Sequence, residues 1–163
     1  MTMDALTAIR KRRSVRRYTG QPIPRADLEA IIDAARLAAT GFNKQPWEFV
    51  VVTEPRRKAA LSLGKDWVCD AAAVVAVVLD PAAPFWLQDG CAAVQNMLVA
   101  ATALGYGACW LEGATAPHEE ELKAALGVPE GLRLLTLVSI GVPAESPTRT
   151  KRPLEDVLHW ETF

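Results

Sequence analysis

The feature that most limits the fold is an uninterrupted apolar run, AAAVVAVVL, at residues 71–79. It is about half as long as the ~18 apolar residues of a membrane-spanning helix, so it predicts a buried strand. A strand that is apolar on both faces belongs inside a sheet whose two faces are both covered. Because 50% of the 163 residues are hydrophobic, the chain can supply such a cover from one sizeable core.

The rest of the chain alternates between helical and extended patterns, without a repeat or a linker. Helices are predicted at residues 4–13, 25–40, 56–64, 86–104 and 117–127, with Asp4 as the first cap and Gly41, Gly105 and Gly127 as stop signals. Further strands are predicted at residues 48–55, 107–111 and 132–142. The helix at 86–104 carries few charges, which predicts burial on most sides, in this domain or in a dimer interface. The pattern therefore predicts a single α/β or α+β domain over residues 1–163.

Charge, cysteines and missing motifs exclude several classes of protein. The net charge is −1 and the pI is about 6.1, which argues against a general nucleic-acid binder. The three cysteines are widely spaced and form no C-x-x-C pair, so reduced thiols in a cytoplasmic protein are expected, with no metal site. No apolar run precedes the first charges, so no signal peptide is predicted. GYGACW (105–110) has Trp where a dinucleotide fingerprint has its third Gly, and the chain has no P-loop and no G-x-S-x-G.

A dense basic segment, RKRRSVRRY at residues 10–18, holds six of the eighteen Lys and Arg. Arg side chains bind phosphate through two parallel hydrogen bonds, and Ser14 adds another donor. Arg12 and Arg16 are four residues apart, so they would share a face if the first helix continued through them. Nucleic acid, membrane phosphate and a phosphorylated cofactor are candidate partners, and a solvated basic face is the alternative.

Two further polar patterns stand apart from this segment. In ATGFNKQPWEFVVV (39–52), the amides of Asn43 and Gln45 suit the edge of a heterocycle, although a simple helix-to-strand loop is the alternative. RTKRP (149–153) is a second basic cluster that could meet the first in space, or be a solvated tail. Trp160 and Phe163 indicate that the tail docks on something.

Taken in order, these patterns resemble the nitroreductase family of flavin mononucleotide (FMN) enzymes. The resemblance runs through RKRRSVRRY, A-T-G-x-N-x-Q-P-W, DGCAAVQNMLVAATALGYGACWLEG and RTKRPLEDVLHW, and so covers nearly the whole chain. It implies an α+β sandwich, with a central, mostly antiparallel sheet flanked by helices. It also implies a homodimer with FMN at the interface, touched by both subunits.

The resemblance assigns roles to individual residues. The phosphate and ribityl chain would be held by Arg12, Arg13, Ser14 and Arg16, with Arg149 and Lys151 closing on the phosphate and Arg152 as an alternative to Lys151. Asn43 would meet the polar edge of the flavin ring. Ala39, Thr40 and Gly41 would pack near the ring from the other subunit, and Glu112 and Gly113 would present backbone N–H groups toward N5 and O4.

The activity implied is that of an FMN-dependent oxidoreductase. It would take hydride from NADH or NADPH and reduce nitroaromatic, quinone or related small-molecule acceptors by a ping-pong mechanism. The flavin N5 carries this chemistry, so no side chain is expected as an obligatory acid or base, and no nucleic-acid or membrane partner is expected. Two alternatives stay open: a specialised flavin enzyme for flavin fragmentation, dehalogenation or dehydrogenation, and a non-enzymatic flavin- or anion-binding module.

Overall fold

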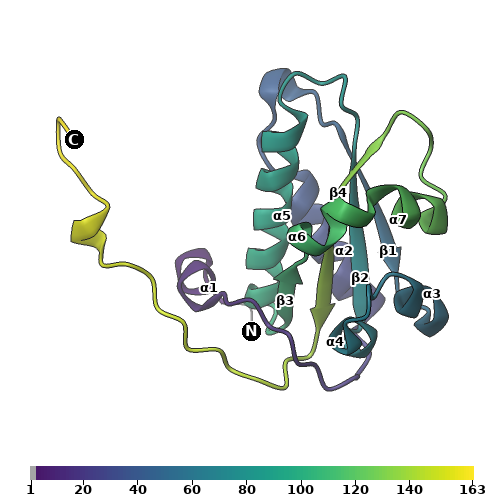
Figure 1. The fold of residues 1–163 in the computed structure, drawn as a ribbon. Helices are drawn as coiled ribbons and strands as arrows, with labels where there is room; N and C mark the ends of the chain where they lie inside the picture. The colour runs from purple at the N-terminus through teal and green to yellow at the C-terminus, as the bar shows by residue number, and fades with distance from the viewer. Residues whose placement is uncertain (1–2) are drawn as a thin grey trace.

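The apolar run at residues 71–79 forms β2 (Ala73–Leu79), an inner strand of a four-stranded sheet (Figure 1). The structure, a computed structural model, describes residues 3–163. The strand order is β1-β2-β4-β3, with every neighbouring pair antiparallel. The other strands are β1 (Trp47–Val52), β3 (Gly107–Trp110) and β4 (Arg133–Gly141). The expected α+β class with an antiparallel sheet flanked by helices is therefore confirmed.

Helices cover both faces of the sheet, as the composition of β2 requires. Val75 and Val77 pack with α2 (Arg25–Arg36) and α5 (Trp86–Ala103) on one face. Val74 and Val78 pack on the other face, in one cluster with Leu61 at the end of α3 (Pro55–Ala60), Val68 of α4 (Asp66–Asp70) and Leu122 of α7 (Glu119–Leu126). Every residue of β2 is buried, and each buried Val contributes roughly 1.5–3 kcal/mol relative to exposure. Among residues 3–163, none of the helices combines the length and apolar character needed to cross a membrane.

Local signals at the helix ends are largely as predicted. Asp4 caps α1 (Ala5–Lys11), since its carboxylate accepts the Thr7 N–H at 3.0 Å. Gly105 and Gly127 follow α5 and α7 with positive φ of 88° and 68°, the left-handed conformation expected of stop signals. The helix predicted to continue to residue 40 instead ends at Arg36. The chain is extended at Thr40 (φ −134°, ψ 150°), and the Gly41 N–H then donates to the Asp89 Oδ1 on α5.

The first helix, expected to end near Arg13, ends earlier, and the residues that follow it are extended. α1 ends at Lys11, so Arg12 and Arg16 share no helix face. The segment is extended, because it occupies the free edge of β3: Ser14 forms a parallel bridge to Ala108, and the Val15 N–H donates to the Ala108 carbonyl at 3.0 Å. The basic segment is thus fixed to the sheet by main-chain hydrogen bonds.

Short elements complete the chain. The helix predicted from Pro117 begins instead at Glu119, preceded by α6 (Glu112–Thr115) and η2 (Ala116–His118). η1 (Gly41–Asn43) precedes β1, and η3 (Leu154–Asp156) lies in the tail.

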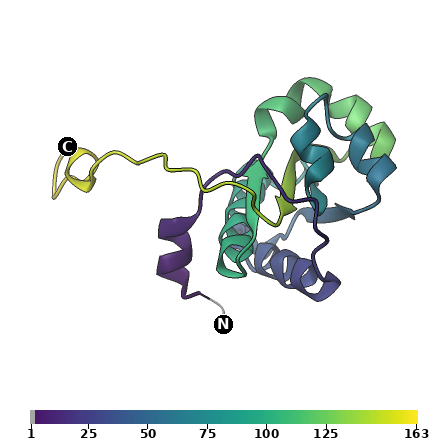
Figure 2. The same cartoon turned by 90° about the horizontal axis from the view of Figure 1, so that it is seen from below.

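The C-terminal arm, residues 145–163, leaves the body after β4 and extends past α1, as both views show (Figures 1 and 2). Its apolar side chains are exposed, with Trp160 78% and Leu154 67% accessible. Trp160 and Phe163 contact no part of the body of this chain closely enough to be buried, so their docking on another surface stays a prediction.

Candidate functional site

The two basic clusters, distant in sequence, line one hollow of about 620 Å³ between the residue 12–16 segment and the start of the arm. Its lining contains six of the predicted site residues together with three others: Arg12, Arg13, Ser14, Arg16, Glu145, Pro147, Arg149, Thr150 and Lys151. Five of these side chains are basic and one is acidic. Such a surplus of positive charge, with a hydroxyl beside it, fits a phosphate dianion.

The basic segment is seated by two glycines of the sheet. A Cβ on Gly107 would lie 2.8 Å from the Val15 Cβ, and one on Gly141 would lie 2.6 Å from the Tyr18 Cδ1. Both positions therefore need a residue without a side chain, so that Val15 and Tyr18 can bury against the strands. Because side chains alternate along an extended chain, burying Val15 turns its neighbours toward the opposite side, which is the side of the hollow.

Tyr18 fixes the far end of the segment. Its hydroxyl donates to the Val15 carbonyl at 2.8 Å and lies 2.8 Å from the Ser139 Oγ. Burial raises the pKa of Tyr18 well above its ordinary value, so the phenol is neutral in the folded protein.

Glu145 is a lining residue that the sequence did not reveal. Its Oε1 accepts the Arg16 N–H at 2.6 Å, and the adjacent Ala144 N–H donates to the Arg17 carbonyl at 2.8 Å. Glu145 therefore ties the arm to the basic segment and holds the two sides of the hollow together. No local motif marks it, because its partner is distant in the chain.

The predicted arginines differ in their contacts. The Arg13 Nη1 donates to the carbonyls of Arg10 and Arg12, both at 2.8 Å, so Arg13 also caps the end of α1. The Arg152 Nη2 donates to the Asp156 carbonyl at 2.6 Å within the arm. Arg152 lies outside the lining, whereas Arg149 and Lys151 lie within it.

The predicted ring-side residues all lie outside the lining of this hollow: Ala39, Thr40, Gly41, Asn43, Glu112 and Gly113. Thr40 and Asn43 belong to the loop before β1, where the Thr40 Oγ1 accepts the Gln45 N–H at 3.3 Å and Asn43 is exposed. Glu112 and Gly113 begin α6 and are exposed. A Cβ on Gly113 would meet no atom within 4 Å, so no other segment packs against that side of the residue.

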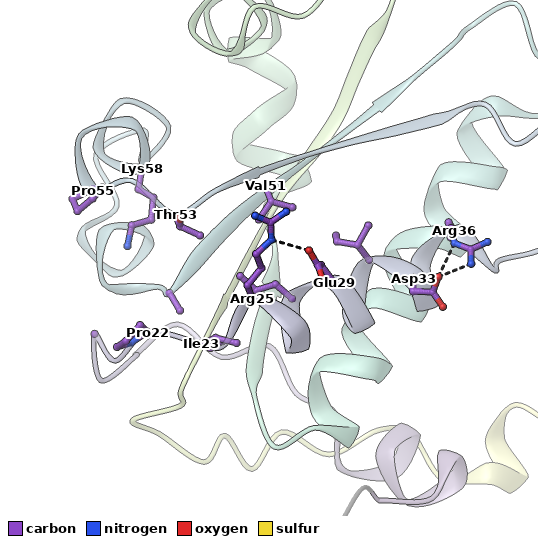
Figure 3. Close-up of a pocket in the computed structure, with 14 residues that line it drawn as sticks. Pro22, Ile23, Arg25, Glu29, Asp33, Arg36, Val51, Thr53, Pro55 and Lys58 are labelled. Carbon is purple, nitrogen blue, oxygen red and sulfur yellow. Dashed lines mark hydrogen bonds and ion pairs between the residues drawn. The ribbon is translucent and has the colours of Figure 1, made fainter.

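A larger hollow of about 880 Å³ lies between α2, β1 and α3 and contains none of the predicted site residues (Figure 3). Two ion pairs of α2 line this hollow: Arg25 pairs with Glu29 at 2.7 Å, and Arg36 pairs with Asp33 at 2.6 Å. Lys58 is 8% exposed, and its Nζ donates to the Cys69 carbonyl at 3.0 Å and to the Ala71 carbonyl. The Lys58 ammonium group thus binds carbonyl oxygens at the C-terminal end of α4. Within residues 3–163, no group of three or more His, Cys, Asp or Glu could hold a metal ion.

Comparison with known proteins identifies the family. The profile of the nitroreductase family matches residues 9–68 and 59–142. An Archaeoglobus fulgidus protein, whose name pairs NADH dehydrogenase with NAD(P)H nitroreductase, is 37% identical over 87% of each chain. A Thermus thermophilus protein named NADH dehydrogenase is 32% identical over 97% of this chain and 96% of its own.

The fold agrees with the same assignment. A crystal structure of a Desulfovibrio desulfuricans protein in complex with FMN superposes with a TM-score of 0.88, at 33% identity, covering 100% of this chain and 99% of that chain. The structural likeness, the family profile and the order of the motifs all point the same way. The chain belongs to the nitroreductase family, as the sequence resemblance predicted.

Proposed function

We propose that this protein is an FMN-dependent NAD(P)H oxidoreductase that reduces nitroaromatic, quinone or related acceptors. The observation that carries the proposal is the basic hollow, in which residues 12–16 and 149–151 lie together. The chain that forms this hollow belongs to the nitroreductase family. Arg12, Arg16 and Lys151 would hold the cofactor phosphate, with Ser14 as a neutral donor. Each charge-assisted hydrogen bond contributes roughly 1.5–3 kcal/mol, so several of them can hold the cofactor without a covalent link.

The ring-side roles belong to the same proposal. Asn43 would bind the polar edge of the ring, and the exposed backbone of Glu112 and Gly113 would donate toward N5 and O4. When bound, FMN supplies the redox chemistry, accepting hydride from NADH or NADPH and reducing the acceptor in a second half-reaction. The protein binds and orients the reactants, and we assign no side chain as an obligatory acid or base. A cytoplasmic location, where NAD(P)H is available, is part of this proposal.

The functional unit that we propose is a homodimer with FMN at its interface. The apolar side chains of the arm are exposed, and the outer edge of β1 faces the hollow beside α2, where Val51 is 41% exposed. The arm, residues 145–163, spans up to roughly 60 Å when extended, at ~3.3 Å per residue, which is enough to reach across a second copy. Thr40, with its neighbours Ala39 and Gly41, would reach the flavin of the other subunit.

An absorbance spectrum of the purified protein tests the proposal, before and after anaerobic addition of NADH or NADPH. We expect flavin bands, present on purification or after incubation with FMN, that bleach with the reductant. Flavin bands that do not bleach would favour flavin fragmentation, dehalogenation or dehydrogenation over NAD(P)H oxidation. A protein that takes up no FMN would refute the cofactor assignment and reopen the role of the basic segment.

A further inference from the structure

The loop at residues 40–45 has an unusual backbone. Phe42, Asn43 and Gln45 have positive φ values of 54°, 55° and 47°, although none is glycine. The left-handed region is disfavoured for residues with a Cβ, so a loop of this kind keeps its shape only where surrounding contacts fix it.

Most hydrogen bonds of the loop are internal. The Asn43 N–H donates to the Thr40 carbonyl at 3.2 Å, and the Lys44 N–H donates to the Gly41 carbonyl at 3.1 Å. Across residues 3–163, one hydrogen bond joins the loop to a helix: the Gly41 N–H donates to the Asp89 Oδ1 on α5 at 3.1 Å. The orientation of the loop relative to the central helix therefore depends on Asp89.

Close packing adds to this hydrogen bond. A Cβ on Gly41 would lie 2.3 Å from the Phe85 Cδ2, so Gly41 fits directly against that ring. The rings of Phe42 and Phe85 are 6.2 Å apart between centroids. The loop thus rests on Phe85 while Asp89, in the first turn of α5, holds its backbone.

Asp89 is an unfavourable residue for stability alone. It is 5% exposed, and its Oδ2 has no hydrogen-bond partner in the described part of the chain. A buried carboxylate oxygen without a partner is costly, so its presence calls for another reason. An N–H bond to a carboxylate is about twice as strong as one to a neutral acceptor, which suits a contact that must hold a disfavoured loop.

We propose that Asp89 is a positioning residue of the cofactor site. Its hydrogen bond to Gly41 holds the loop in the conformation that presents Asn43 to the flavin ring. The inference rests on the proposed function, because the contact between Asn43 and the ring is part of that proposal.

Flavin binding to the apoprotein tests this role, with FMN and riboflavin as the two probes. Asp89→Ala should weaken both by about tenfold, equivalent to about 1.4 kcal/mol, because it acts on the ring side. Asp89→Asn keeps an acceptor oxygen without the charge and should lose about threefold. Arg12→Ala, on the phosphate side, should weaken FMN much more than riboflavin, which lacks the phosphate. Gln88→Ala, an exposed neighbour on the same helix turn, is the matched control and should change neither.

A double-mutant cycle separates positioning from general destabilisation. If Asp89 acts through Asn43, adding Asp89→Ala to Asn43→Ala should cost little further affinity. Additive losses, or an Asp89→Ala protein that binds like Gln88→Ala, would overturn the inference. Where Asp89→Ala does not fold, Asp89→Asn carries the same cycle with the same criterion. Wild-type protein that binds neither flavin would instead refute the proposed function, and this inference with it.

Discussion

Replacing Gly107 by Ala should disturb the proposed phosphate site indirectly, because the atoms nearest a Cβ at Gly107 belong to Val15, which is outside the lining of the hollow. The new Cβ would lie 2.8 Å from both the Cβ and the Cγ1 of Val15, and 2.9 Å from its Cγ2. Such distances force Val15 to move. Because Val15 stands between Ser14 and Arg16, its displacement moves both groups away from their places in the hollow.

The expected magnitudes follow from these contacts. Overpacking of a buried site costs about 1–3 kcal/mol in the free energy of unfolding. Losing one charge-assisted hydrogen bond to the phosphate costs roughly 1.5–3 kcal/mol, which is about 10- to 100-fold in the FMN dissociation constant. Adding Val15→Ala removes two of the three short contacts. We therefore expect the double variant to recover part of the loss, with a favourable coupling of about 1 kcal/mol.

The assay combines FMN titration, followed by quenching of flavin fluorescence, with urea unfolding of the same preparations. Val15→Ala alone is the control for the lost methyl groups. A Gly107→Ala protein with wild-type affinity and stability would show that the segment is not seated on this glycine. If the losses in free energy of unfolding and in FMN affinity simply add in the double variant, the steric argument is refuted.

Arg12→Ala and Arg16→Ala should each weaken FMN binding by about 10- to 100-fold, from the loss of one charge-assisted bond, and leave the proposed dimer intact by light scattering; unchanged affinity would contradict the phosphate assignment. Ending the chain after Arg152 keeps Arg149 and Lys151 but removes the apolar part of the arm, so light scattering should report a monomer, and an intact dimer would exclude the arm as a major contact. Tyr18→Phe should lower the free energy of unfolding by about 1–3 kcal/mol in urea. Burial raises the pKa of Tyr18 above the usual 10.0, so the native state keeps a proton that the unfolded state loses as pH rises past 10. Wild-type stability should therefore fall above pH 10 more steeply than that of Tyr18→Phe, and parallel curves would argue against a buried neutral phenol.

The sequence alone was sufficient where a feature depends on neighbouring residues. The run at 71–79 predicted an inner strand with two covered faces, because a strand with no polar side chain cannot present either face to water. Asp4, Gly105 and Gly127 marked helix ends correctly, since caps and left-handed stops depend on a few consecutive residues. The family was also readable, because its motifs occur in order along the chain.

Only the tertiary structure decided how distant segments meet. The first helix was expected to end near Arg13, but no local pattern indicated that Ser14 would pair with Ala108 of β3, because the sheet edge offers main-chain partners that local periodicity cannot report. Gly107 and Gly141 read as ordinary strand residues until Val15 and Tyr18 are seen packed on them. Asp89 and Glu145 bond to residues 48 and 129 positions away. Sequence patterns record what each segment does with its near neighbours, whereas these contacts exist only once the whole chain has packed.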